Sequence, residues 1–177
     1  MYRFSSDRVG FRKLNKDDVT QAYPDALNDP EICKYLETRH TKQTIDTCIK
    51  FISECNLNPS EQLYGMYLLS NNHHIGNIKI GYINKIYKVG TISIVLLDKN
   101  YYGKGYGFEV LKRMTEFGFS DLKLEKIEAG CISQNIASIS IFRKVGYVQE
   151  GDIRSSIILD NHRTNYILLG ITKSELR

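Results

Sequence analysis

Three glycines, each separated from the next by one residue, lie between an apolar β-branched run and an amphipathic segment, and this arrangement constrains the fold most. The run at 92–97 predicts a buried strand, the glycines are Gly103, Gly105 and Gly107, and residues 107–122 carry apolar side chains at helical spacing. Glycine lets the backbone approach an anion closely, and the first turn of a helix offers unpaired N–H groups and a positive dipole end. The pattern predicts a strand, a tight loop and a helix whose start can bind phosphate.

Two better-known phosphate loops do not match this segment. A Walker loop would end in Gly-Lys-Ser or Gly-Lys-Thr, and a dinucleotide fingerprint would belong to a first βαβ unit followed by an acidic residue on the second strand. Lys104 adds a positive charge to the loop. A turn whose glycines serve backbone geometry alone is the alternative that the loop by itself leaves open.

The remaining periodicities predict an α+β arrangement of layers. In chain order the predicted elements are a strand at 9–14, a helix at 17–27 weakened by Pro24, a helix at 44–55, strands at 62–69, 74–82 and 90–97, the helix at 107–122, a strand at 126–132, a helix at 136–145, and strands near 147–151, 153–159 and 166–171. The three consecutive strands are expected to pair antiparallel. No internal repeat or linker interrupts the 177 residues, so we expect a single domain over 1–177.

Composition argues against several classes of protein. With 42% hydrophobic and 25% charged residues the chain resembles an average globular protein, and its net charge of +4 is spread without a basic stripe, which disfavours a nucleic-acid binder. The four cysteines, Cys33, Cys48, Cys55 and Cys131, show no metal-ligand spacing, so reduced thiols and no metal are expected. No apolar run approaches the ~18 residues that a membrane span needs, which predicts a cytoplasmic protein without a membrane partner.

The segment after the glycine loop carries a second pattern. Asn135 follows a predicted strand, Ser138 lies in the next helix, and that helix ends in the Lys-x-Gly-Tyr sequence of residues 144–147. Together with Gly105 and Gly107, which match a [QR]xxGx[GA] loop, this segment resembles the GNAT acetyltransferase family over residues 90–151. Tyr102 departs from that pattern, because Gln or Arg is usual at its position.

The resemblance implies a GNAT fold, in which a mixed, mostly antiparallel sheet with two splayed central strands is flanked by helices. Acetyl-CoA would lie between the strand ending at Leu97 and the strand ending near Ile132. By the same resemblance, the co-substrate would contact the backbone of Val95, Leu96 and Leu97, the loop residues Tyr102, Gly103, Lys104, Gly105, Tyr106 and Gly107, and the side chain of Asn135. Asn suits the pantetheine arm, since its amide both donates and accepts hydrogen bonds.

Acetyl transfer to an amine requires a free amine, a polarised thioester carbonyl and a proton for the departing thiolate. Many GNAT enzymes supply that proton from a helical tyrosine, but Phe142 occupies the equivalent position here. Ser138 is the nearest candidate acid on that helix, as the resemblance to relatives of the ribosomal-protein acetyltransferases implies; a helix residue bonded to its own backbone is the alternative. The resemblance implies a carboxylate base on the strand before the glycine loop, but Thr91 and Ser93 occupy that region here. Glu37 is the candidate base instead, because it lies in the segment between the first helices that walls the acceptor site in similar enzymes; a surface charge paired with Arg39 is the alternative.

The acceptor side is less constrained. Asn77, Lys79 and Asn84 belong to a stretch that looks like those of GNAT enzymes acting on nucleotide-linked amino sugars, so they would face such an acceptor; a solvated strand is the alternative. Protein N-termini, polyamines and other small amines stay open, as do a homodimer and a non-catalytic acyl-CoA-binding module. His73 and His74 are interpreted as turn residues.

Overall fold

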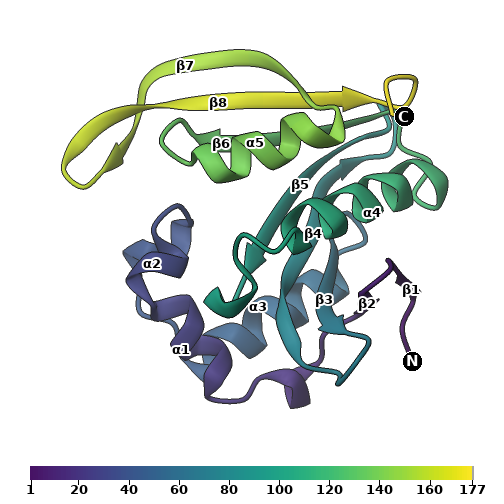
Figure 1. Ribbon diagram of the computed structural model, residues 1–177, viewed down its shortest axis with the longest axis vertical. Helices are drawn as coiled ribbons and strands as arrows, with labels where there is room; N and C mark the ends of the chain where they lie inside the picture. Colours follow the sequence, from purple (N-terminus) through teal and green to yellow (C-terminus); the bar gives the residue numbers. More distant parts are fainter. Residues whose placement is uncertain (177) are drawn as a thin grey trace.

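An eight-stranded sheet with helices on both faces forms the body of the chain, and the computed structural model describes residues 1–176 (Figure 1). Its strands are β1 (Phe4–Ser5), β2 (Val9–Arg12), β3 (Gln62–Leu68), β4 (His74–Asn84), β5 (Val89–Leu96), β6 (Lys126–Ile132), β7 (Val148–Leu159) and β8 (His162–Thr172). Its helices are α1 (Ala22–Asn28), α2 (Pro30–Cys33), α3 (Ile45–Leu57), α4 (Tyr106–Ser120) and α5 (Ile136–Val145), with short 3₁₀ turns η1 (Lys16–Asp18), η2 (Glu37–His40) and η3 (Lys99–Tyr101).

The strand order β1-β2-β3-β4-β5-β6-β8-β7 is antiparallel except at one place. Strands β5 and β6 run parallel and pair over only three positions, the last of which joins Thr91 to Glu128. Beyond it the two strands separate, so Ser93 is exposed and Ile94 and Val95 are half-buried although they lie in the middle of the sheet. The structure confirms the mixed sheet with splayed central strands.

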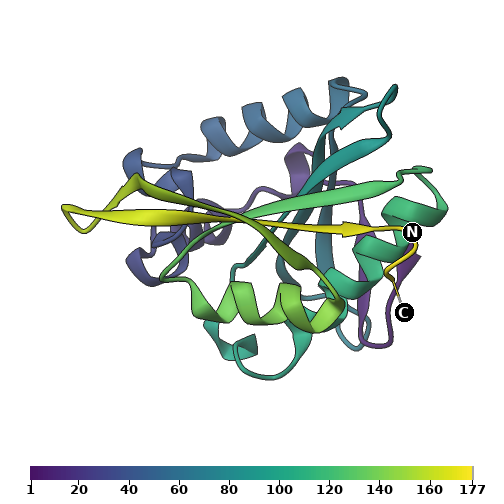
Figure 2. The ribbon, with the colours of Figure 1, turned by 90° about the horizontal axis from the view of Figure 1, so that it is seen from above.

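Helices on opposite faces bury two apolar clusters. Helices α4 and α5 cover one face, where Leu111 and Met114 pack with Ile127 of β6. Helices α1 and α3 cover the other face, as Figure 2 shows for α3 and α5 on opposite sides of the sheet. Thr44 begins α3 by accepting a hydrogen bond from the N–H of Thr47, as its sequence predicts.

The helix predicted at 17–27 is wrong in its first half. Residues 16–18 form the turn η1, and α1 begins only at Ala22. Pro24 therefore lies in the first turn of α1, where a backbone N–H has no intrahelical partner, and it neither kinks nor ends the helix. No helix among the described residues is both long and apolar enough to cross a membrane.

The two closing strands predicted at 147–151 and 153–159 are one strand. β7 continues from Val148 to Leu159, with register shifts after Gln149 and Ile153 that account for the apparent break. With β8 it forms a long hairpin that extends beyond the rest of the sheet (Figure 1). Strand β1 and helix α2 were not predicted, because both are too short to show periodicity.

Candidate functional site

The gap between β5 and β6 exposes backbone groups of β5. The N–H of Leu97 donates to the carbonyl of Ile75 at 2.8 Å, so Leu97 faces β4. Backbone N–H and C=O groups in an antiparallel strand alternate in direction from one residue to the next. The backbone groups of Val95 therefore also point towards β4, whereas those of Ile94 and Leu96 point into the gap. Of the three residues expected to contact pantetheine through their backbone, only Leu96 is oriented to do so, and Ile94 joins it.

Tyr102 reduces the number of free backbone groups in the gap. Its hydroxyl donates to the carbonyl oxygen of Leu96 at 3.2 Å. The residue that replaces the usual Gln or Arg thus folds back onto the end of β5 and occupies one acceptor. This leaves the N–H of Leu96 and both backbone groups of Ile94 to face the gap.

The glycine loop adopts backbone conformations that explain its composition. Gly103 and Gly105 have φ values of 70° and 82°, in the left-handed region that glycine adopts at little cost, and Gly105 immediately precedes α4. A Cβ at Gly103 would meet no atom within 4 Å, so the loop is open on that side. An open loop at a helix start fits a diphosphate group.

Arg8 and Glu109 support this loop, and the sequence did not reveal either. The guanidinium of Arg8 binds the Glu109 carboxylate at 2.6 Å and donates to the carbonyl oxygen of Lys104 at 3.2 Å. It also stacks over the ring of Tyr106, 3.9 Å from the centroid. A carboxylate in the first turn of α4 would repel a phosphate, and Arg8 neutralises it; hydrogen bonds from Ser6 and Arg8 hold the pKa of Glu109 low against the opposing effect of burial.

Asn135 and Ser138 begin α5 beside the end of β6. The side-chain oxygen of Asn135 accepts a hydrogen bond from the N–H of Ser138 at 3.2 Å, so Asn135 is the N-cap of α5. The Ser138 hydroxyl lies 3.4 Å from the sulfur of Cys131. Phe142 is buried against Tyr147, with ring centroids 5.0 Å apart.

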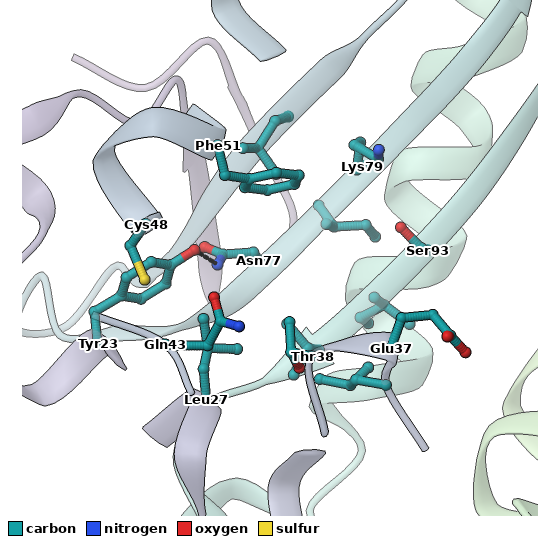
Figure 3. Close-up of a pocket in the computed structure, with 15 residues that line it drawn as sticks. Tyr23, Leu27, Glu37, Thr38, Gln43, Cys48, Phe51, Asn77, Lys79 and Ser93 are labelled. Atoms are coloured by element: carbon teal, nitrogen blue, oxygen red, sulfur yellow. Dashed lines mark hydrogen bonds between the residues drawn. The ribbon is translucent and has the colours of Figure 1, made fainter. Parts of the chain in front are cut away.

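A cavity of about 400 Å³ opens on the other face of the sheet, bounded by β4, β5, α1, α3 and η2 (Figure 3). Its apolar wall includes Leu27, Leu36, Phe51, Leu63 and Ile78. Its polar groups include Glu37, Asn77, Lys79 and Ser93. Two of the three predicted acceptor residues, Asn77 and Lys79, therefore lie in one cavity with Glu37.

Asn84, the third predicted acceptor residue, lies elsewhere. Its side-chain oxygen accepts hydrogen bonds from the N–H groups of Ile86 and Tyr87 in the turn after β4, so it stabilises that turn and does not line the cavity. The resemblance grouped it with Asn77 and Lys79, but Asn84 is the last residue of β4, and the turn that follows holds it apart from them.

Lys79, which lines the cavity, and Arg39, which follows Glu37 in η2, are each paired with a carboxylate. The ammonium of Lys79 lies 2.7 Å from the Glu61 carboxylate, and both side chains are largely buried. The guanidinium of Arg39 donates to the Leu36 carbonyl at 2.7 Å and lies 3.3 Å from the Glu37 carboxylate. The Glu37 side chain itself is 82% exposed and reaches the solvent at the rim.

A buried hydrogen-bond chain ends in the cavity wall. The Nε2 atom of His74 lies 2.9 Å from both the Gly76 carbonyl and the Asn77 side-chain oxygen, so it carries the proton. Asn77 then donates to the hydroxyl of Tyr23 at 2.7 Å, an interaction drawn in Figure 3. The His74 ring stacks between those of Tyr23 and Tyr67. The interpretation of His74 as a turn residue is wrong, because it is the first residue of β4; His73 does lie in the turn.

We expect acid to destabilise the protein partly through His74. Burial lowers the pKa of this imidazole, and hydrogen bonds to Asn77 and Gly76 oppose the shift only in part. Below the ordinary pKa of 6.5 the unfolded chain binds a proton that the folded chain does not, so stability falls as pH decreases from there towards the lowered folded value.

Denaturant titrations from pH 8 to pH 5 would measure this loss. The variant His74→Gln keeps a donor to Asn77 but cannot titrate, and it should lose less unfolding free energy over that range than the wild type. Equal losses in the two proteins would contradict the assignment.

No cluster of three or more His, Cys, Asp and Glu side chains within residues 1–176 is placed to hold a metal ion.

Comparisons with known proteins agree with this geometry. A family model described as an acetyltransferase (GNAT) domain matches residues 8–148. An uncharacterized N-acetyltransferase, p20, of Bacillus licheniformis is 25% identical over 153 residues, covering 84% of each chain. The spermidine N(1)-acetyltransferase of Escherichia coli is 26% identical over 96 residues, covering 54% of this chain and 51% of that one.

Solved structures share the fold over nearly the whole chain. The spermidine N-acetyltransferase of Vibrio cholerae, in complex with CoA and spermine, superimposes with a TM-score of 0.85 at 18% identity, covering 95% of this chain and 97% of that one. A GNAT-family acetyltransferase of Bacillus anthracis gives 0.82 at 23% identity, covering 97% and 98%. The chain belongs to the GNAT family and is an acetyl-CoA-dependent N-acetyltransferase.

Proposed function

We propose that this enzyme acetylates a primary amine carried on an aliphatic chain, the chemical class that includes the polyamines. The observation that carries the proposal is the cavity of Figure 3, whose walls are mainly apolar and whose most exposed charged group is the Glu37 carboxylate. Apolar walls suit methylene groups, and a carboxylate at the rim attracts an ammonium ion.

The donor would bind on the opposite side of the gap. The open loop around Gly103 and Gly105, with Lys104 beside it, would hold the diphosphate at the start of α4. The pantetheine arm would lie between β5 and β6, where the backbone groups of Ile94 and Leu96 face the gap. Asn135 would contact this arm with its amide NH₂, because its oxygen is used in capping α5.

A nucleotide-linked amino sugar fits the cavity less well than the sequence suggested. Its diphosphate would need an unpaired cation, but Lys79, the lysine that lines the cavity, is paired with Glu61. The similarity to spermidine N-acetyltransferases supports an aliphatic amine instead.

Glu37 has two roles in this proposal. Its carboxylate would attract the cationic amine to the cavity and then accept a proton as the neutral amine forms. The solvent at the rim can carry that proton away. Ser93 and Val95 line the same cavity on β5, so the amine would approach the gap from the side on which β5 exposes them.

Thiol release from acetyl-CoA, followed with DTNB, tests the proposed function. The panel would contain spermidine, spermine, putrescine, a simple alkylamine, a UDP-linked amino sugar and a peptide with a free N-terminus. We expect turnover with the aliphatic amines and none with the amino sugar. Preference for the amino sugar would refute the acceptor class, and tight acetyl-CoA binding without turnover on any amine would favour a non-catalytic module.

Replacing Glu37 with glutamine should raise KM for the aliphatic amine about fivefold, since an exposed charge contributes up to about 1 kcal/mol. The dissociation constant for acetyl-CoA should not change, because Glu37 lies on the acceptor side. Glu54→Gln is the matched control: Glu54 is an exposed carboxylate of α3, paired with Lys50. Equal KM values for the two variants would remove Glu37 from the acceptor site.

A further inference from the structure

A tyrosine of β8 reaches the place where β5 and β6 separate. Tyr166 pairs with Ile132 of β6, and its ring extends over the backbone of Gly130. A Cβ added at Gly130 would collide with the Tyr166 hydroxyl oxygen and with the ring carbons beside it. Glycine at this position therefore makes room for the phenol.

The strand register places Gly130 at the opening of the gap. Thr91 and Glu128 form the last parallel pair of β5 and β6, so two residues further on Ser93 and Gly130 share a face where the strands no longer pair. Ser93 lines the acceptor cavity on that face. The tip of Tyr166, over Gly130, thus lies at the opening of the gap on the face of the sheet that carries the cavity, although Tyr166 does not itself line the cavity. A thioester held in the gap would meet an amine that enters from this face.

The Tyr166 hydroxyl is available to a ligand. Among residues 1–176 it forms no side-chain hydrogen bond, and the residue is half-buried. Burial raises the pKa of Tyr166, and the neighbouring Cys131 and Glu37 raise it further, so the phenol keeps its proton at neutral pH. The structure therefore presents a protonated phenol to the gap.

We propose that Tyr166 is the general acid that protonates the departing CoA thiolate. The inference rests on the proposed acetyl transfer. The amine nitrogen bonds to the acyl carbon, the carbon–sulfur bond breaks, and sulfur leaves with the bonding pair. The thiolate takes the phenolic proton, and the resulting phenolate takes the proton that the acylated nitrogen loses, so Tyr166 ends the cycle protonated.

Ser138 is the weaker candidate for this role. Its hydroxyl faces Cys131, whose side chain points to the α5 side of β6, away from the face that carries Tyr166. A phenol, with a pKa of about 10 in its unperturbed state, also gives up a proton far more readily than an aliphatic hydroxyl.

The first test compares Tyr166→Phe with Tyr87→Phe, the same change at an exposed tyrosine of the β4–β5 turn. We expect Tyr166→Phe to lower kcat about 100-fold while KM for acetyl-CoA stays the same, and Tyr87→Phe to leave both unchanged. An unchanged kcat in Tyr166→Phe would overturn the proposal, as would a 100-fold loss in Ser138→Ala alone.

The second test does not depend on turnover. In protein labelled with ¹³C at the ζ carbon of tyrosine, the Tyr166 signal is identified by its absence in Tyr166→Phe. It should shift when CoA is added and shift less with desulfo-CoA, which lacks the sulfur. Equal shifts with the two ligands would show that the hydroxyl does not meet the thiol, whereas a shift specific to CoA in a protein that acetylates no amine would count against the proposed function alone.

Discussion

Replacing Gly105 with aspartate is expected to weaken acetyl-CoA binding by about 100-fold or more, because the change places a carboxylate where two phosphates should lie. Gly105 has a φ of 82° immediately before α4, and a Cβ there would meet only the Arg8 guanidinium, at 3.6 Å. The new side chain would therefore extend into the open space that the loop offers to a ligand. Isothermal titration calorimetry with acetyl-CoA measures the loss.

Gly105→Ala separates charge from backbone strain. Alanine suffers the same left-handed φ, at a cost of about 1–2 kcal/mol, but brings no charge. Its acetyl-CoA affinity should fall much less than that of the aspartate variant, and thermal melts should show similar stability losses for both. Equal affinities for the aspartate variant and the wild type would remove the diphosphate from this loop.

Replacing Asn77 with alanine should lower the free energy of unfolding by about 2 kcal/mol, since it leaves the buried Tyr23 hydroxyl without its donor and removes one partner of His74. Asn77 is only 6% exposed, so water does not replace the lost hydrogen bonds freely. Urea denaturation followed by circular dichroism measures the change.

A double-mutant cycle with Tyr23→Phe checks the cause. Once the Tyr23 hydroxyl is absent, Asn77→Ala leaves one fewer buried polar group without a hydrogen-bond partner. Its loss of unfolding free energy should therefore be about 1 kcal/mol smaller than in the wild-type background. Additive losses would mean that the 2.7 Å contact between Asn77 and Tyr23 contributes nothing to stability.

Local patterns predicted the part of the fold that surrounds the donor. β6 and α5 begin and end at the predicted residues, and α4 follows the glycine loop within one residue of its predicted start. Their periods are long and clear, and the residues that mark their ends are local. Pro24 shows the limit of this reasoning, because whether a proline breaks a helix depends on where the helix begins.

The contacts that complete the site join distant parts of the chain. Arg8 and Glu109 are 101 residues apart, and neither stands out in its own segment. His74 looked like a turn residue because Asn71 and Asn72 precede it, and only the packing of Tyr23 and Tyr67 around its ring shows that it is part of the core.

Asn84 was predicted to belong to the site and lies outside it, whereas Tyr166 was not predicted and lies at the gap. The family resemblance grouped Asn84 with Asn77 and Lys79, but the turn after β4 holds its side chain away from the cavity. Tyr166 seemed an ordinary strand residue, and only the register of β8 on β6 brings its hydroxyl over Gly130. A cytoplasmic location, a homodimer and a single-domain organisation stay predictions.

A crystal structure of the enzyme with CoA tests the central claim most directly, because it shows where the thiol lies. We predict the diphosphate at the loop of Gly103 and Gly105, the pantetheine arm between β5 and β6, and the sulfur beside the Tyr166 hydroxyl, facing the cavity that holds Glu37. A CoA molecule bound outside the gap, or a thiol directed away from that cavity, would contradict the account.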